Sequence, residues 1–107
     1  MTRIYVFGKH TCAKCKTTRN KLTHFLSDWR MDHAVQLVFH DLDTLDGRAE
    51  GAFYDVTPQI PTTIIETDGR QVARWDGAVP NSQAVHLVLQ SFDLEALDRQ
   101  SFPGRPL

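Results

Sequence analysis

The sequence contains no long apolar run, and this absence limits where the protein is expected to work. Its first apolar stretch, residues 4–7, is too short for the hydrophobic region of a signal peptide. No later segment approaches the length of a membrane-spanning helix. We therefore expect a cytoplasmic protein that does not contact a membrane.

Net charge is also small. It is −1 with the histidines neutral, which argues against a general role in binding nucleic acid or membrane surfaces. Acidic residues are absent before Asp28. The basic residues of this segment surround the two cysteines and are Arg3, Lys9, Lys14, Lys16, Arg19 and Lys21. A local positive field would favour thiolate over thiol, although these side chains could equally be solvated on a helix surface.

Cysteine is scarce, since Cys12 and Cys15 are the only two in the chain. Their two-residue spacing at the start of a helix allows the two sulfurs to meet. A lasting structural disulfide is unusual in a reducing compartment. The pair therefore indicates catalysis, redox sensing or metal binding.

The length of 107 residues and the apolar fraction of 41% are sufficient for one compact domain without disulfide staples. We assign this domain to residues 1–100. The last segment, 101–107, contains two prolines and a glycine and is predicted to be a flexible tail.

Apolar periodicity predicts that the two cysteines lie in different environments. Residues 4–7 are typical of a short buried strand, and the i, i+3, i+4, i+7 pattern of a helix follows at Leu22, Phe25, Leu26 and Trp29. Seven residues before Leu22, the same stripe reaches Cys15. Cys12 falls at or just before the first turn, where it or Thr11 would cap the helix. Cys12 is therefore expected to be exposed to solvent and to face the unpaired N–H groups at the positive end of the helix dipole, and Cys15 to face the core.

The remaining pattern predicts an α/β domain. A strand is expected at 35–39, running on into 41–43, and a helix at 45–54 that Gly47 and Gly51 weaken. Strands at 62–67 and 71–75 are joined by a tight turn at Asp68-Gly69, and a final helix begins at Asn81 or Ser82. The order is β-α-β-α-β-β-α, which predicts a four-stranded mixed sheet with helices on both faces. Cys12 would lie beyond the carboxyl end of the first strand, where open α/β sheets carry their sites.

These residues resemble the thioredoxin-like superfamily over nearly the whole chain. The first half, with Cys12-Ala13-Lys14-Cys15 and Lys9 three positions earlier, is similar to a glutaredoxin start. The second half resembles thioredoxin through segments 41–43, 54–56, 60–62, 68–70 and 75–77, which occur in the family's order.

The resemblance implies a role for each matching residue. Cys12 matches the attacking cysteine, Cys15 the resolving cysteine, and Pro61 the cis proline beside the dithiol, with the Ile60 backbone free to pair with an extended substrate. Without the cysteines, Pro61 would be interpreted as a strand-start proline.

Four further positions complete the candidate site. Lys14 would favour the Cys12 thiolate, unless it is only a mobile surface side chain. Lys9, Ile60 and Gly77 match positions that help to hold glutathione in glutaredoxins. Trp75 is either an apolar platform for the substrate or a strand tryptophan that covers the edge of the core.

The chain also departs from both families. Ala13 stands where glutaredoxins commonly have proline, and the Gly-Pro of thioredoxins is absent. Val6 occupies the position of the buried thioredoxin aspartate, so solvent, Lys9 or His10 would have to accept the Cys15 proton. Segment 75–80 lacks the usual double glycine and following aspartate, which makes glutathione binding doubtful.

We therefore predict a monomeric thiol–disulfide oxidoreductase that acts on protein disulfides through a redox-active disulfide, without a bound cofactor. Its electron donor would be thioredoxin reductase or glutathione. One alternative is a non-enzymatic redox-sensing adaptor. The other is a zinc or iron–sulfur module, for which His10, His24, His33 and His40 are available ligands. No second closely spaced ligand pair supports the metal alternative.

Overall fold

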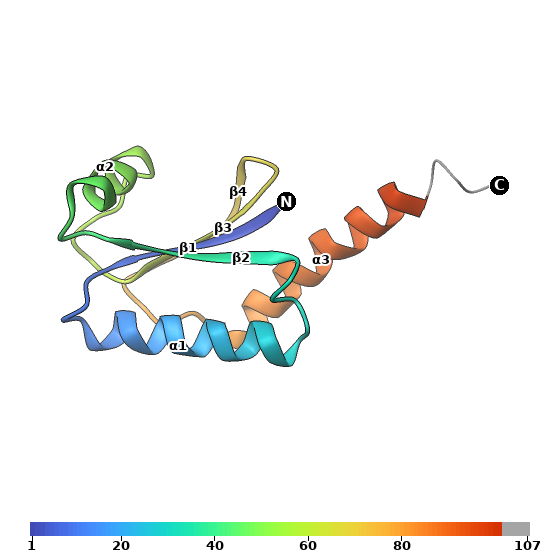
Figure 1. The fold of residues 1–107 in the computed structure, drawn as a ribbon, viewed down its shortest axis with the longest axis horizontal. Helices are drawn as coiled ribbons and strands as arrows, with labels where there is room; N and C mark the ends of the chain where they lie inside the picture. Colours follow the sequence, from blue (N-terminus) through green and yellow to red (C-terminus); the bar gives the residue numbers. More distant parts are fainter. Residues whose placement is uncertain (102–107) are drawn as a thin grey trace.

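The computed structural model describes the backbone of residues 1–101 and the side chains of residues 1–92. Its elements are β1 (Thr2–Gly8), α1 (Ala13–Asp28), β2 (Val35–Asp41), α2 (Leu45–Phe53), β3 (Thr62–Thr67), β4 (Arg70–Asp76) and α3 (Ser82–Ser101) (Figure 1). This order confirms the predicted β-α-β-α-β-β-α arrangement. Helix α3 includes Ser101, the first residue of the predicted tail, and residues 102–107 lie outside the described residues.

The four strands form one mixed sheet in the order β2-β1-β3-β4. Strand β1 is parallel to β2 and antiparallel to β3, and β3 is antiparallel to β4. In this register Ile4 lies between Leu37 of β2 and Ile65 of β3. The central strands β1 and β3 are therefore the ones that the helices can cover most fully.

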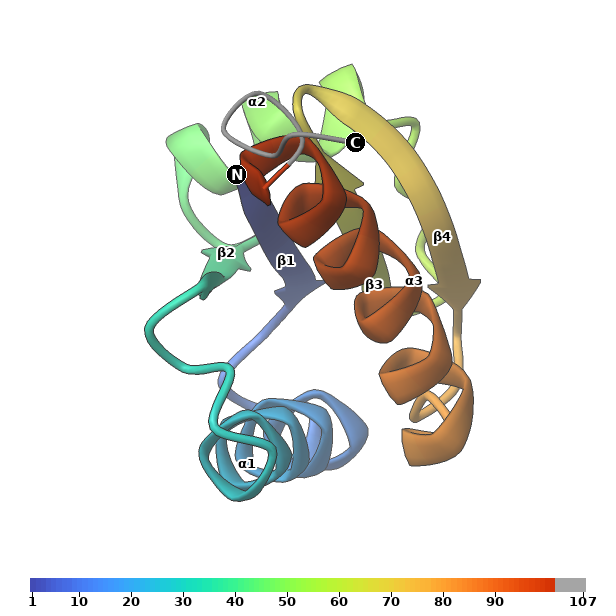
Figure 2. The ribbon, with the colours of Figure 1, turned by 90° about the vertical axis from the view of Figure 1, so that its right-hand side faces the viewer.

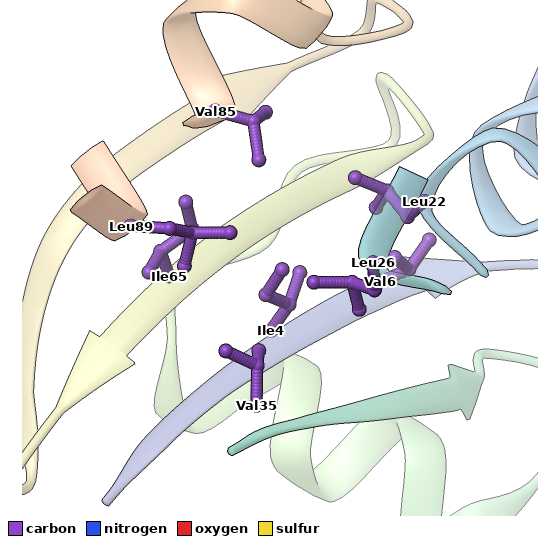
Figure 3. Packing of buried hydrophobic residues seen from close by; sticks show 8 residues of the cluster. All are labelled: Ile4, Val6, Leu22, Leu26, Val35, Ile65, Val85 and Leu89. Carbon is purple, nitrogen blue, oxygen red and sulfur yellow. The ribbon is translucent and has the colours of Figure 1, made fainter. Parts of the chain in front are cut away.

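Helices α1 and α3 cover one face of the sheet, and α2 lies on the opposite side from α1 (Figures 1 and 2). The α1/α3 face holds the aliphatic core, which consists of Ile4, Val6, Leu22, Leu26, Val35, Ile65, Val85 and Leu89 (Figure 3). Alternation along β1 sends Ile4 and Val6 to this face, and period-four spacing sends Leu22 and Leu26 to meet them.

Two glycines allow α2 to pack on the ends of β1 and β2. A Cβ at Gly47 would collide with the Asp41 carbonyl, and one at Gly51 would lie 3.0 Å from Leu42 Cδ2. Thr44 caps the helix, because its Oγ1 accepts the Gly47 N–H at 2.9 Å. The glycines that weakened the sequence prediction are therefore the residues that make this contact possible.

Local signals set the other boundaries as the sequence predicts. Asn81 Oδ1 accepts the N–H groups of Gln83 and Ala84 and so caps α3. Asp68 and Gly69 have positive φ angles of 52° and 80°, as the tight β3–β4 turn requires. Across the described residues, no helix combines the length and hydropathy that a membrane span needs.

Candidate dithiol active site

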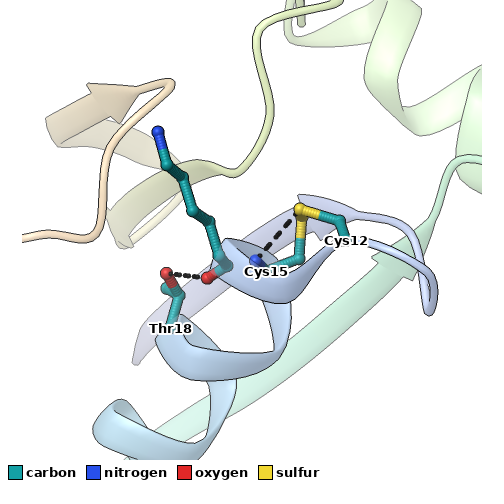
Figure 4. Close-up of a disulfide and its surroundings, with 4 residues drawn as sticks. Cys12, Cys15 and Thr18 are labelled. Atoms are coloured by element: carbon teal, nitrogen blue, oxygen red, sulfur yellow. Dashed lines mark hydrogen bonds between the residues drawn. A yellow bond between two sulfur atoms is a disulfide. The ribbon is translucent and has the colours of Figure 1, made fainter.

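The two cysteines meet at the N-terminus of α1. They form a disulfide with a Cα–Cα distance of 5.2 Å, and Cys12 is the N-cap, whose Sγ accepts the Cys15 N–H at 3.1 Å (Figure 4). Cys15 is fully buried, which confirms that it faces the core. Cys12 is half-buried and so less exposed than the sequence predicts, because its sulfur folds back over the first helical turn.

The helix start favours negative charge on Cys12. The first turn of α1 contains no acidic residue, and its free N–H groups form the positive end of the helix dipole. Lys14 is exposed, and within the described residues its ammonium group makes no ion pair. Thr18 is buried one turn below Cys15, with its hydroxyl donating to the Lys14 carbonyl at 2.8 Å (Figure 4). The site therefore pairs a partly accessible sulfur, Cys12 Sγ at the helix N-cap, with a buried sulfur, Cys15 Sγ, behind it. This arrangement suits thiol–disulfide exchange.

Gly8, the last residue of β1, provides the space for Cys15. A Cβ built at Gly8 would lie 2.5 Å from Cys15 Sγ and 2.8 Å from its Cβ. Real Cβ atoms do not approach that closely, so only glycine allows the sulfur to rest on the end of the strand. The sequence does not indicate this contact, because Gly8 lies just beyond the strand predicted at residues 4–7.

The fold brings carboxylates to the basic segment. Lys9 Nζ lies 3.6 Å from Asp43 Oδ1, and His10 Nε2 lies 3.4 Å from Asp41 Oδ2. The end of β2 is held against β1, since the Leu42 N–H donates to the Gly8 carbonyl at 2.9 Å. The charge segregation seen in the sequence is therefore partly cancelled in space on this side of the dithiol.

Two other basic residues have packing roles away from the sulfurs. Lys21 Nζ donates to the Pro80 carbonyl at 3.1 Å and ties α1 to the chain that leads into α3. The Arg19 guanidinium carbon lies 4.2 Å from the centre of the Phe39 ring, a cation–π contact. The N-terminal basic group thus serves several purposes, and only part of it can act on Cys12.

The Ile60–Pro61 peptide bond is cis and lies at the same end of the sheet as the dithiol. Phe7 of β1 pairs with Thr62 of β3. Gly8 and Pro61, the next residues outward, therefore lie side by side at the end of these two central strands, where Cys15 rests on Gly8. The Gly77 N–H donates to the Pro61 carbonyl at 2.8 Å. The Ile60 N–H and carbonyl have no hydrogen bond to any described residue, so this backbone segment is available to a ligand.

Gly77 and Trp75 line the connection after β4. Gly77 has a φ of +77°, and a Cβ there would lie 3.4 Å from Gln59 Cβ, so its backbone borders the segment before Pro61. Trp75 is half-buried and packs against the aliphatic core. The side chain therefore covers the core edge, as one of the two sequence interpretations proposed.

An arginine network that sequence analysis missed supports the cis-proline segment. Arg74 donates to the carbonyls of Tyr54 at 2.6 Å and Asp55 at 3.0 Å, and its Nε lies 3.1 Å from Asp76 Oδ2. Asp76 Oδ1 accepts the Thr62 hydroxyl at 3.0 Å, directly after Pro61. The i, i+2 spacing of Arg74 and Asp76 on a strand was the available signal, because it places both on one face.

A metal centre finds no support in the described residues. They contain no group of three or more His, Cys, Asp or Glu side chains arranged to hold an ion. His24, one of the candidate ligands, instead lies 3.0 Å from Asp28 on the exposed side of α1. The cysteine pair has no third or fourth ligand among the residues that the structure describes.

No protein-family model and no curated protein matches the sequence. Solved structures do match the fold. Thioredoxin-2 of the malaria parasite, described as a component of its protein secretion machinery, has a TM-score of 0.71 at 16% identity, over 85% of this chain and 82% of that one. Fasciola hepatica thioredoxin has a TM-score of 0.65 at 19% sequence identity, over 83% of this chain and 79% of that one. Oxidised mitochondrial thioredoxin 3 of Saccharomyces cerevisiae has a TM-score of 0.64 at 22% sequence identity, over 84% of this chain and 77% of that one. The chain therefore has a thioredoxin-like fold.

Proposed function

We propose that the protein is a thiol–disulfide oxidoreductase that reduces protein disulfides through Cys12 and Cys15. The observation that carries the proposal is the unequal placement of the two sulfurs. Cys12 is partly accessible, and its Sγ accepts a hydrogen bond from the Cys15 backbone N–H of the helix. Cys15 is buried directly behind it. An accessible thiolate can attack a substrate, and a buried neighbour can then resolve the product.

The reaction balances in two exchanges. Cys12 thiolate attacks one sulfur of a substrate disulfide, that S–S bond breaks, and the leaving thiolate takes a proton from solvent. Cys15, after losing its proton, attacks Cys12 Sγ in the mixed disulfide and releases the second substrate thiolate. Two electrons pass to the substrate, and the Cys12–Cys15 disulfide forms.

The segment around Ile60 would hold the substrate. Its N–H and carbonyl are unpaired among the described residues and could bind an extended peptide as an added strand. Lys9 and Gly77 border this region, and Lys14 extends from the first turn of α1. These positions are proposed substrate contacts.

The same proposal includes a return of electrons to the Cys12–Cys15 disulfide, by thioredoxin reductase or by glutathione. We propose a monomer that works in the cytoplasm and needs no bound cofactor. An insulin-reduction assay supplied with each donor separately would identify the donor that supports turnover.

Cysteine variants test the assigned roles. Cys12→Ser should abolish insulin reduction, because the attacking sulfur is lost. Cys15→Ser should accumulate a mixed disulfide with the substrate, detected by mass spectrometry and released by dithiothreitol. Trapping by Cys12→Ser instead would reverse the roles. No turnover with either donor, combined with reversible Cys12–Cys15 oxidation, would favour the redox-sensing adaptor.

A further inference from the structure

Helix α2 has its apolar side turned outward. Its sheet side consists of the buried Gly47 and Gly51, whereas Leu45 and Phe53 are each 78% exposed. Ala49, also exposed, lies between them at i, i+4, i+8 spacing. At roughly 100° per residue, these three residues point away from the two glycines. A surface helix normally buries its apolar stripe, so this arrangement is inverted.

The fold itself does not account for this outer face. The sheet contact of α2 requires glycine at position 47, and the aliphatic core lies on the other side of the sheet. The Phe53 ring contacts its neighbour Tyr54 edge-on, with ring centroids 5.0 Å apart, and is otherwise open to solvent. A partner that covers these two side chains would remove their apolar surface from water, which favours binding.

We propose that the outer face of α2, formed by Leu45, Ala49 and Phe53, docks the protein partner of the dithiol. This inference rests on the proposed function. The face is joined to the dithiol loop, because Asp43 at the approach to α2 contacts Lys9, three residues before Cys12. Because α2 and α1 lie on opposite sides of the sheet, a partner seated over α2 must extend around the ends of β1 and β2 to meet the sulfurs (Figure 1).

Charge defines the chemistry of this partner. Asp46 and Glu50, four residues apart, are exposed along one border of the apolar face, and Arg48 is exposed on the opposite border. A complementary segment therefore presents apolar side chains with Lys or Arg along the border that meets Asp46 and Glu50. Acidic residues at the same positions would be repelled.

The size and symmetry of the face argue against a second copy of this chain. One helix of nine residues offers far less than the roughly 800 Å² per partner that a stable interface buries. An antiparallel twofold contact would also place Asp46 and Glu50 against their own copies. Small interfaces of this kind are typical of transient redox encounters.

The test measures binding to the oxidised protein, so it does not depend on turnover. The probe is a synthetic amphipathic Leu/Lys helix, compared with a Leu/Glu helix of the same pattern. Titration into ¹⁵N-labelled protein should shift amide signals of residues 45–53 with the basic peptide. Leu45→Ser/Phe53→Ser should weaken binding at least tenfold, whereas Leu87→Ser, a matched change at a 65% exposed position of α3, should not.

Each other result decides the question. Shifts located elsewhere, equal binding of the acidic peptide, or no effect of the double variant would overturn the docking face while leaving insulin reduction intact. Dimerisation that the double variant abolishes would identify a second copy as the occupant and overturn the proposed partner. Binding at α2 by a protein that reduces no disulfide would support the face and reject the proposed function.

Discussion

The two faces of the sheet are built from different interactions. The α1/α3 face is mainly aliphatic, and its only buried polar side chains among the described residues are uncharged hydroxyls such as Thr18 and Thr63. The α2 face instead collects the rings of Tyr5, Phe7, His40 and Tyr54, with centroid distances of 4.8–5.7 Å between the closest pairs. Strand alternation creates both faces from the same four strands.

A buried carboxylate sharpens the difference. Glu66 is 8% exposed on the α2 face and accepts hydrogen bonds from Tyr54 Oη at 2.6 Å and Tyr5 Oη at 3.4 Å. The α1/α3 face, which carries Cys15, has no buried charged side chain among the described residues. The dithiol therefore rests on the face without an internal proton acceptor, and any acceptor for Cys15 must come from solvent or from the exposed loop of Lys9 and His10.

The largest expected effect is a truncation on the aliphatic face. Ile4 is fully buried among the core residues, so Ile4→Ala should lower the free energy of unfolding by about 3–4 kcal/mol, through lost burial and a cavity. Urea denaturation measures this change. Leu87→Ala, at a 65% exposed position, should change stability by less than about 0.5 kcal/mol. Equal effects at the two positions would contradict the assigned core.

The next effect tests the contact between this face and the dithiol. Gly8→Ala places a Cβ 2.5 Å from Cys15 Sγ and should cost about 2–3 kcal/mol through overpacking at the start of α1. Insulin reduction should fall as the sulfur is displaced. Cys15→Ala removes the nearest atom, so a double-mutant cycle should show that Gly8→Ala is less costly in that background. An unchanged cost would mean that the sulfur does not rest on Gly8.

Local patterns in the sequence were sufficient for the elements and for the cysteine geometry. Seven-residue spacing linked Cys15 to Leu22 and predicted its burial, because helical periodicity depends only on neighbours along the chain. Turn chemistry at Asp68-Gly69 likewise fixed the β3–β4 connection. The mixed character of the sheet could be predicted, because a strand–helix–strand segment gives a parallel pair and a tight turn gives an antiparallel one.

Contacts between residues that are distant in sequence could not be predicted from local patterns, because they depend on how the ends of the strands are placed in the folded sheet. Asp43 and Lys9 are far apart in sequence, and only the pairing of β2 with β1 brings them to 3.6 Å. Gly47 was interpreted as a weakness of α2, since its value appears only when the Asp41 carbonyl lies against it. For Arg74 the sequence signals only the pairing with Asp76, because its other two acceptors are backbone carbonyls, which any residue provides.

A smaller effect is expected on the aromatic face. Tyr54→Phe leaves Glu66 with one fewer donor and should cost about 1–2 kcal/mol. Burial and the hydrogen bond to Glu66 raise the pKa of the Tyr54 phenol well above its usual value. The unfolded chain therefore loses this proton first, so the stability from Tyr54 is complete below about pH 10 and declines as the pH rises further.

Unfolding measured from pH 8 to 11.5 tests the sign. Wild-type stability should fall more steeply above pH 10 than that of Tyr54→Phe. Tyr5→Phe, whose hydroxyl is 3.4 Å from Glu66, serves as the control and should have the weaker effect. A steeper alkaline loss in Tyr54→Phe than in the wild type would contradict the hydrogen-bond assignment.

The smallest effect is expected from the Arg74 hydrogen-bond network on this face, and it would be seen in the proposed reduction of insulin. Arg74→Lys keeps the charge but cannot span the Tyr54 and Asp55 carbonyls together with Asp76, so it should cost about 1 kcal/mol. The Thr62 contact with Asp76 should then loosen beside Ile60. We expect the KM for insulin to rise two- to threefold, with unchanged alkylation of Cys12 by iodoacetamide. A change confined to the cis-proline segment should alter how the peptide substrate is held and leave the reactivity of Cys12 unchanged. Slower alkylation would therefore show that Arg74→Lys also disturbs the Cys12 sulfur.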